Sequence, residues 1–383
     1  MPNFYIGDEN GKARKIKNMY IGGSDGTAKK VKRLYMGNNE GKANCVFEKE
    51  YKLSYYGTAT SLNSARRLFD ATSNSNYAIF TGGYSVDKYV NTADAYDKSL
   101  IKHNISPLSV ARQRACSGTV GNYSLIAGGL ATGITYATVD VYTTNLTKST
   151  TSNLSVARGY LACSTINSYI IFGGGHTSGS EKTRYSTTDV YDENLTKISI
   201  SSLSQARSNL AAATIGKYVI FGGGEASNSS SNKIDIYDDS LTKINTTSSL
   251  SQARHYLSAT AVGNYALFSG GTSSSISYAT VDTYDTSLTR KSASSLSSAR
   301  YYMGTTTVGN YALFGGGYDG SIYRVTVDAY DISLTRTIPT SLSKSRHMLS
   351  ATSIENYALF AGGCSKVDSN TIDFDTVDVY QAI

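Results

Sequence analysis

Residues 254–284 read RHYLSATAVGNYALFSGGTSSSISYATVDTY, and this stretch decides the fold. Its segments are short and bounded by turn residues: His255 to Val262, then Gly263-Asn264, Tyr265 to Gly271, Thr280 to Tyr284, and Leu288 to Ser295 beyond it. Short runs rich in β-branched and aromatic residues between Gly, Ser and Asn predict four strands and leave no room for a helix. Gly263-Asn264 fits a two-residue hairpin because both residue types tolerate a positive φ.

The same pattern recurs seven times, as three markers show. An Arg follows a Ser- and Leu-rich stretch at Arg66, Arg112, Arg158, Arg207, Arg254, Arg300 and Arg346, with spacings of 46, 46, 49, 47, 46 and 46. A Gly pair follows each Arg, at residues 82–83, 128–129, 173–174, 222–223, 270–271, 315–316 and 362–363. An Asp-x-Tyr motif then begins at Asp94, Asp140, Asp189, Asp235, Asp282, Asp328 and Asp378. Internal repeats of this length indicate a solenoid, an array or a propeller.

The second strand of each repeat is apolar on both faces, as in Tyr265 to Phe268. Such a strand belongs to a sheet with another sheet on either side. Four-stranded units that must stack, and must also avoid an exposed last edge, do both by closing into a ring. We therefore predict an all-β fold, a seven-bladed β-propeller over residues 51–383.

The seventh repeat stops at Ile383 without a fourth strand, whereas the other six have one that begins near a Leu, such as Leu241 or Leu288. A spare strand-like segment, Tyr51 to Thr60, precedes Arg66, although Ser54 stands where the other repeats have Leu. We expect residues 51–60 to complete the last blade and to join the early and late parts of the chain.

Residues 1–50 follow a different period, since Tyr5-Ile6-Gly7, Tyr20-Ile21-Gly22 and Tyr35-Met36-Gly37 are 15 apart. Each copy predicts a strand, a polar Gly turn and a second, Lys-rich strand, so three short β-hairpins are expected. Such hairpins are marginal alone in water and should pack on another surface or on copies of themselves. This arm has ten Lys and Arg against six Asp and Glu.

The order Arg, apolar strand, Gly pair and later aromatic, in units of about 46 residues, resembles the Kelch-repeat family of propellers. The resemblance covers residues 51–383, but the Trp typical of Kelch units is absent, and Leu-Thr-Lys or Leu-Thr-Arg takes its place, as in Leu241-Thr242-Lys243. The arm repeat Tyr-(Ile/Met)-Gly…Gly-x-Ala resembles short repeats in tail and baseplate proteins of phages and prophages of Gram-positive bacteria. Together these resemblances imply an attachment arm that carries a recognition head.

Several features restrict the location of the protein. No run of about 18 apolar residues exists, so no transmembrane helix and no membrane partner are expected. The N-terminus lacks an apolar stretch of signal-peptide length, so standard secretion is not expected. Four Cys, at positions 45, 116, 163 and 364, are too few and too scattered for a disulfide framework or a zinc site, and we interpret them as small buried residues.

The ligand-binding candidates lie at the rim where the marker Arg opens the first strand. Seven Arg around one mouth would attract anions unless each is paired, so the set Arg66, Arg112, Arg158, Arg207, Arg254, Arg300 and Arg346 is either an anion-attracting ring or part of the fold. The variable loops after the Gly pairs lie at the same rim and add Tyr84, His176 and Tyr318, while His255 and His347 directly follow a marker Arg. Resemblance to Kelch proteins implies partner binding at this face.

Catalysis has little support in the sequence. There are four His, and no P-loop, Gly-x-Ser-x-Gly or HExxH motif is present. The triple Gly173-Gly174-Gly175 precedes a loop instead of a helix, which argues against a dinucleotide site. The Asp of Asp-x-Tyr is interpreted as a residue that fastens the third strand's turn. We expect no catalytic residue, cofactor or metal, and no nucleic-acid partner despite a net charge of +7, because the basic residues are spread along the chain.

The sequence thus leads to one hypothesis and two rivals. The first is a non-enzymatic tail or baseplate protein of a phage or phage-tail-like particle, assembled in the bacterial cytoplasm and acting extracellularly. Its propeller would recognise a host-surface glycan or anionic wall polymer, and residues 1–50 would bind tail proteins and could form a homo-oligomer. The rivals are a purely structural baseplate component and a carbohydrate-active enzyme on the same scaffold.

Overall fold

The structure is a computed structural model that describes residues 51–179, 182–227, 229–368 and 370–383 in full, and the backbone of six strands within residues 1–50. The described residues form strands and turns and contain no helix, so none is found that could cross a membrane. The chain divides into two compact units, Met1–Lys52 with Ile383 and Leu53–Ala382.

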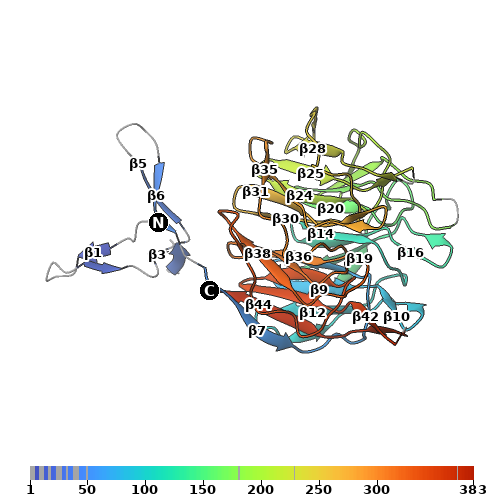
Figure 1. The fold of residues 1–383 in the computed structure, drawn as a ribbon, viewed down its shortest axis with the longest axis horizontal. Coiled ribbons are helices and arrows are strands. Elements are labelled where there is room, and N and C mark those ends of the chain that lie inside the picture. Colours follow the sequence, from blue (N-terminus) through green and yellow to red (C-terminus); the bar gives the residue numbers. More distant parts are fainter. Residues whose placement is uncertain are drawn as a thin grey trace. The chain divides into compact units, whose positions relative to one another are not determined.

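The second unit consists of seven four-stranded antiparallel sheets, the blades (Figure 1). Blade 1 contains β8 (Asp70–Ser73), β9 (Tyr77–Thr81), β12 (Ala93–Asp97) and β13 (Lys102–Asn104), and blade 2 contains β14 (Cys116–Val120), β15 (Tyr123–Ala127), β18 (Val139–Thr143) and β19 (Lys148–Thr150). Blade 3 contains β20 (Ala162–Ile166), β21 (Tyr169–Gly173), β22 (Thr188–Asp192) and β23 (Lys197–Ile198), and blade 4 contains β24 (Ala211–Ile215), β25 (Tyr218–Gly222), β28 (Ile234–Asp238) and β29 (Lys243–Ile244). Blade 5 contains β30 (Ser258–Val262), β31 (Tyr265–Ser269), β34 (Val281–Asp285) and β35 (Arg290–Ser292), and blade 6 contains β36 (Gly304–Val308), β37 (Tyr311–Gly315), β38 (Val327–Asp331) and β39 (Arg336–Thr337). Blade 7 contains β40 (Ser350–Ile354), β41 (Tyr357–Ala361) and β44 (Val377–Ala382), with β7 (Leu53–Ala59) as its outer strand.

The first strands of the seven sheets contact one another in a closed circle, because β40 of blade 7 packs against β8 of blade 1. The prediction of an all-β, seven-bladed propeller is confirmed. The outer strand of the last blade comes from the start of this unit: β7 pairs antiparallel with β44 from Val377↔Ala59 to Ala382↔Leu53, with one irregularity between Val379 and Tyr380. The two ends of the unit are therefore hydrogen-bonded to each other.

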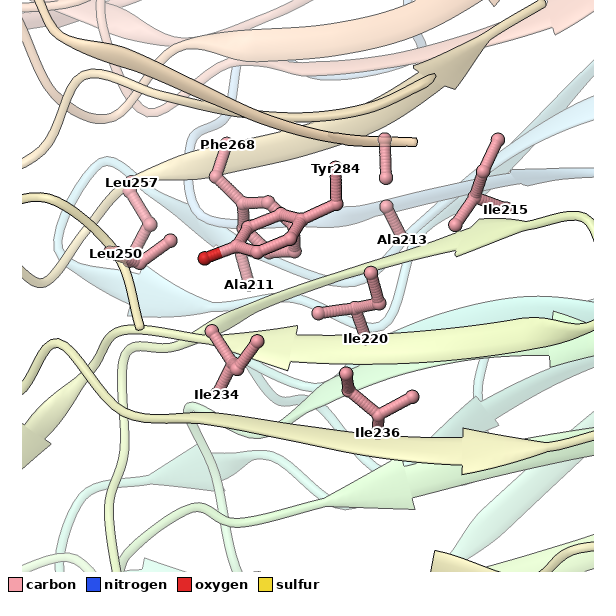
Figure 2. Packing of buried hydrophobic residues seen from close by; sticks show 11 residues of the cluster. Ala211, Ala213, Ile215, Ile220, Ile234, Ile236, Leu250, Leu257, Phe268 and Tyr284 are labelled. Carbon is pink, nitrogen blue, oxygen red and sulfur yellow. The ribbon is translucent and has the colours of Figure 1, made fainter. Parts of the chain in front are cut away.

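The core lies between neighbouring blades, as the two-sided apolar strands require. In one cluster Ile220 of β25 and Ile236 of β28 lie in blade 4, facing Phe268 and Tyr284 of blade 5, and all four are fully buried (Figure 2). Burying one such side chain contributes roughly 1.5–3 kcal/mol relative to leaving it exposed. Since each sheet depends on the next for this burial, the ring is the smallest unit that shields every sheet.

Short hairpins project after the second strand in five blades: β10 (Tyr84–Ser85) with β11 (Lys88–Tyr89), β16 (Leu130–Ala131) with β17 (Ile134–Thr135), β26 (Glu225–Ala226) with β27 (Ser229–Ser230), β32 (Thr272–Ser273) with β33 (Ile276–Ser277), and β42 (Cys364–Val367) with β43 (Asn370–Asp373). Figure 1 shows β10, β16 and β42 on the same side of the propeller. The first residue of each hairpin bridges to the residue after a marker Arg, for example Tyr84 to Arg67 and Thr272 to His255. We call this side the hairpin face.

The Gly pairs begin these connections and adopt positive φ. In repeats with three glycines the pair is the last two, as at Gly174-Gly175, one residue later than the sequence analysis placed it. A Cβ on Gly128 would overlap the carbonyl oxygen of Arg158, so a larger residue would push the next blade away.

The first unit contains three two-stranded hairpins, as predicted: β1 (Tyr5–Gly7) with β2 (Ala13–Lys15), β3 (Met19–Gly22) with β4 (Ala28–Val31), and β5 (Arg33–Gly37) with β6 (Ala43–Glu48). The expected burial of Cys45 and the packing partner of the arm concern side chains outside the described residues.

Candidate functional site

Each marker Arg forms a buried ion pair within its own blade. All seven Arg side chains are at most 1% exposed. Their partners are the Asp residues of Asp-x-Tyr, at N···O distances of 2.5–2.9 Å: Arg66–Asp94, Arg112–Asp140, Arg158–Asp189, Arg207–Asp235, Arg254–Asp282, Arg300–Asp328 and Arg346–Asp378. The repeated markers thus describe one pair in every blade.

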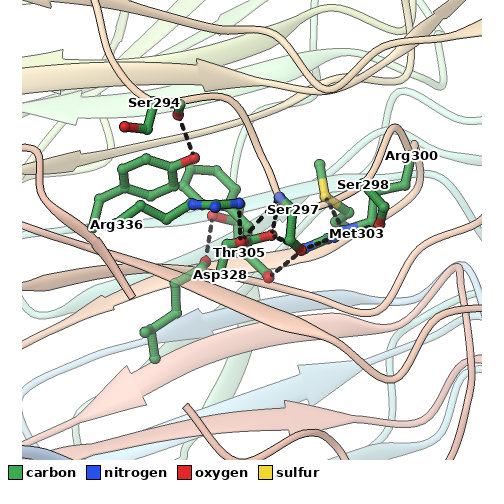
Figure 3. Close-up of polar contacts among 11 residues, drawn as sticks. Ser294, Ser297, Ser298, Arg300, Met303, Thr305, Asp328 and Arg336 are labelled. Atoms are coloured by element: carbon green, nitrogen blue, oxygen red, sulfur yellow. Dashed lines mark hydrogen bonds and ion pairs between the residues drawn. The ribbon is translucent and has the colours of Figure 1, made fainter. Parts of the chain in front are cut away.

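Blade 6 shows how the pair is completed (Figure 3). Asp328 lies between Arg300, at 2.6 Å, and Arg336 of the outer strand, at 3.3 Å. The backbone N–H of Ser297 also donates to this carboxylate. In blades 2 to 5 the Lys or Arg of the Leu-Thr-Lys/Arg motif takes the place of Arg336, and in blade 1 Lys102, which follows Leu100-Ile101, lies 3.9 Å from Asp94. In blade 7 the Tyr55 hydroxyl of β7 donates to Asp378 instead, at 2.7 Å.

These pairs decide between the two alternatives for the seven Arg, in favour of a role in the fold, and they correct the expectation for the Asp residues. The seven Arg cannot line a ligand-binding rim, because their side chains are buried and neutralised. The Asp residues do not fasten a turn of the third strand, since they hold the Arg and the linker before each first strand. Burial by itself opposes ionisation of Asp235, but Arg207 and Lys243 hold the pKa of this carboxyl below its usual value.

A second sevenfold feature surrounds the axis on the hairpin face. Two residues after each marker Arg the backbone has a positive φ of 54–59°, at Leu68, Arg114, Tyr160, Asn209, Tyr256, Tyr302 and Met348. Each of these residues donates its N–H to the carbonyl of its counterpart in the preceding blade, with N···O distances of 2.9–3.4 Å, and Leu68 donates to Met348. Seven backbone hydrogen bonds therefore close a circle, which we call the mouth ring.

The mouth ring surrounds a cavity of about 210 Å³ on the propeller axis. All seven ring residues line it, together with the residues that follow them, such as Leu161 and Met303, and with Asp70, Ser258 and Ser350 at the starts of first strands. Every blade therefore contributes to one site, and its side chains differ from blade to blade. This axial cavity is the candidate functional site.

Arg114 is the cation of the axial cavity. Its guanidinium carbon lies 4.6 Å from the ring centre of Tyr160 and 4.7 Å from that of Tyr302, with Tyr256 at 6.0 Å. Among the described residues it forms no ion pair, and its Nε has no hydrogen-bond partner. Aromatic faces hold a guanidinium in place without neutralising it. Arg114 thus places a positive charge between flat rings in the cavity.

Asp70, the first residue of β8, is the acidic group of the same cavity. Burial raises the pKa of this carboxyl to about 7, although Arg112 and Arg114 act in the opposite direction. The described part of the chain gives it no ion pair. Near neutral pH the carboxyl is therefore present in both its protonated and its ionised form.

Asp70 makes stability depend on pH. Its pKa of about 7 lies above the ordinary value of 3.8, so between these values the folded state holds the proton more tightly and stability falls as pH rises. The loss is complete above pH 7 and amounts to about 4 kcal/mol. We expect Asp70→Asn to melt well above the unmodified protein at pH 8 and close to it at pH 4, in thermal scans. Asp87→Asn, on the exposed tip of a hairpin, is the control, and equal curves for both variants would contradict the assignment.

The other predicted site residues lie one layer outside the mouth ring, in the bridges between the Arg-following residues and the hairpins. The His176 ring is 3% exposed and stacks on Tyr160 at 4.5 Å. The His255 Nδ1 is hydrogen-bonded to the Ser230 hydroxyl at 2.9 Å. His347, 8% exposed, donates from Nδ1 to the Cys364 carbonyl at 3.0 Å.

Burial lowers the pKa of each of these three histidines, to about 4 for His347, so they are neutral wall residues at pH 7. Tyr84 is half-buried at the start of β10, and Tyr318 is half-buried in the corresponding loop of blade 6, where it bridges to Tyr301 and Tyr323. Arg67 lies 4.9 Å from the Tyr84 ring and pairs with Asp373. The structure therefore gathers the His and Tyr candidates around the cavity, and it places the Arg candidates elsewhere.

The remaining cysteines fit their interpretation in part. Cys364 is buried, whereas Cys116 and Cys163 of blades 2 and 3 are partly buried and free. Among the residues the structure describes, no three His, Cys, Asp or Glu side chains are grouped so as to hold a metal ion.

Comparison with known proteins supports the architecture. No family model matches the sequence, and no curated protein matches it either. Solved structures do match, among them the "Structure of YjhT", with a TM-score of 0.58 and 12% sequence identity over 74% of this chain and 99% of that one. At this identity the likeness shows the fold alone. A propeller scaffold serves many functions, so the function must be argued from the axial cavity.

Proposed function

We propose that this protein is a non-enzymatic tail or baseplate protein of a phage or phage-tail-like particle, whose Kelch-like propeller recognises an anionic glycan of the host surface through the axial cavity. The observation that carries the proposal is Arg114, a cation that forms no ion pair among the described residues, held between tyrosine faces in a cavity to which every blade contributes. A single fixed charge between flat rings suits a sugar unit that bears one anionic group.

The arm repeats support the particle assignment through their resemblance to tail and baseplate repeats. In this proposal residues 1–50 bind neighbouring particle proteins, and the propeller is carried as the exposed head. The protein would be assembled in the bacterial cytoplasm and would act outside it. The purely structural rival needs no ligand in the axial cavity, so ligand binding separates the two.

Arg114→Gln tests the proposal. Calorimetric titration of the full chain with D-glucuronate should give binding that falls roughly 10- to 150-fold in the variant, the equivalent of a charged hydrogen bond of about 1.5–3 kcal/mol. Lys217→Gln is the matched control, since it removes one positive charge from an exposed turn outside the axial cavity. Glucose should bind the unmodified chain as weakly as glucuronate binds the variant.

Retention on an array of purified Gram-positive wall polymers extends the test to host ligands. Lack of binding to glucuronate and to every polymer, together with tight assembly with a tail protein, would overturn the glycan proposal in favour of a structural role.

One observation favours the enzymatic rival, namely a carboxyl in the cavity whose pKa is about 7. General acid or base catalysis needs such a group. Turnover of a glycan by the full chain, lost in Asp70→Asn with binding retained, would establish that function.

A further inference from the structure

An aromatic surface extends from the axial cavity across one part of the hairpin face. It is formed by Tyr256, Tyr301, Tyr302, Tyr318, Tyr323 and His347, and we call it the aromatic wall. Its rings contact one another in an unbroken series: the ring centres of Tyr256 and Tyr302 are 4.2 Å apart, Tyr302 and Tyr301 5.2 Å, Tyr301 and Tyr318 5.8 Å, Tyr318 and Tyr323 4.6 Å, and Tyr323 and His347 4.9 Å. The five Tyr side chains are only partly buried.

The wall is confined to blades 5 to 7. At the matching bridge positions blade 2 has Gln113 and Leu130, and blade 4 has Ser208 and Glu225. In blade 1 the position is taken by Arg67 and Tyr84, where the Arg covers the ring. If these aromatic residues served only packing, the repeated blades would carry them at every matching position. Their restriction to one side indicates that a ligand extends from the cavity over blades 5 to 7.

The wall begins inside the cavity, because Tyr256 and Tyr302 belong to both. The cavity itself, at about 210 Å³, is smaller than the ~300 Å³ at which pockets for drug-sized ligands begin. It therefore has room for one small unit beside Arg114, and any larger ligand must leave by the mouth. Among the described residues, the unbroken series of six rings outside and beside the mouth lies along the wall, whereas Tyr84 with Tyr89 in blade 1 and His176 with Tyr160 in blade 3 form separate pairs.

We propose that the ligand is a uronic-acid chain held by its end, with the terminal unit in the axial cavity and the following units lying over the aromatic wall. This inference rests on the proposed glycan-binding function of the cavity. A uronate unit carries its charge on the ring itself, so one unit brings both the carboxylate for Arg114 and a flat face for Tyr160 or Tyr302. Tyrosines pair an apolar face with a polar hydroxyl, which suits the units that follow.

The decisive experiment titrates the full chain with galacturonic acid and with its dimer, trimer and tetramer. Affinity should rise at least 10-fold from monomer to tetramer, and the stoichiometry should stay at one protein per chain for the longer oligomers. Tyr301→Ala should remove most of this gain and leave monomer affinity unchanged, since Tyr301 does not line the cavity. Tyr301→Phe keeps the ring and should keep the gain. Unchanged monomer affinity also shows that the variants are folded.

The outcomes separate the two proposals. Monomer binding that depends on Arg114, without a gain in the tetramer or with a gain that Tyr301→Ala leaves intact, overturns the chain inference and leaves the cavity's function standing. Tetramer binding that is independent of Arg114, or a protein-to-chain ratio that grows with length, shows internal recognition and overturns end-on binding. Absence of binding by monomer and tetramer alike overturns both.

Discussion

A chain that lacks residues 51–60 is expected to melt at least ~10 °C below the unmodified protein, because a few kcal/mol shift the melting temperature of a large domain by this amount. The deletion removes β7 and leaves β44 as an open edge of blade 7. Its backbone hydrogen bonds to Val377–Ala382 are lost, and so are the edge contacts of Tyr55 with Tyr380, at 5.3 Å, and of Tyr56 with Tyr357, at 5.2 Å. An unpaired edge also invites association between chains, so the shortened protein should aggregate on heating.

Removal of residues 1–50 alone is the matched control, since it spares β7. Differential scanning calorimetry of the two shortened chains measures the difference directly. Equal melting temperatures for both would show that the shared strand contributes nothing to the stability of the ring. Tyr55→Phe refines the test, because it removes only the hydrogen bond to Asp378 and should cost about 1–3 kcal/mol.

The second large effect concerns the buried ion pair of a blade. We expect Asp328→Ala to lower the free energy of unfolding by about 3–5 kcal/mol, because it leaves Arg300 buried without its counter-ion. Arg336 loses its contact with the same carboxylate, although its side chain reaches solvent and can rehydrate. Urea unfolding at pH 7 measures the change.

Two further variants show whether the unpaired charge of Arg300 or the space left by the missing Asp328 side chain causes the loss of stability. Arg300→Met combined with Asp328→Leu fills the site with apolar atoms and should recover much of the loss, because no charge is left unpaired. Lys98→Ala breaks an exposed pair with Glu355 and should cost less than about 1 kcal/mol. If the double variant is as unstable as Asp328→Ala alone, the unpaired charge is not the cause.

The architecture could be predicted from the sequence because each blade repeats the same local rules. Each repeat of about 46 residues contains strands that are apolar on both faces and Gly turns at a regular spacing. Closure of the blades into a ring follows from the need to cover both faces of every sheet. The supply of an outer strand from residues before Arg66 also follows from counting strands. These features depend on residue type and order, which the sequence states directly.

The fate of the marker Arg could not be predicted in the same way. Arg300 and Asp328 are far apart along the chain, and whether an Arg at the start of a strand points to solvent or into the blade depends on a partner two strands away. The recurrence of Asp-x-Tyr at the same period was the available signal, since two markers of opposite charge repeated in every unit predict seven pairs as well as seven surface sites.

The axial cavity was missed for a different reason. Arg114, Tyr160 and Asp70 stand in different blades and share no motif, so only the closed ring brings them together. A usable signal did exist: the position two residues after each marker Arg varies among Leu, Arg, Tyr, Asn and Met between otherwise similar repeats. Variation at one fixed position of a repeated scaffold indicates a place where side chains are free to serve binding.

The mouth ring has a consequence for how such a protein diversifies. Its seven bonds run from main chain to main chain, so they impose no choice of side chain beyond tolerance of a left-handed conformation. Exchange of the residues at Leu68 or Met348 would alter the entrance without loosening the circle that supports it. Single substitutions at these seven positions can therefore change the ligand specificity one step at a time, while the circle of backbone hydrogen bonds is retained.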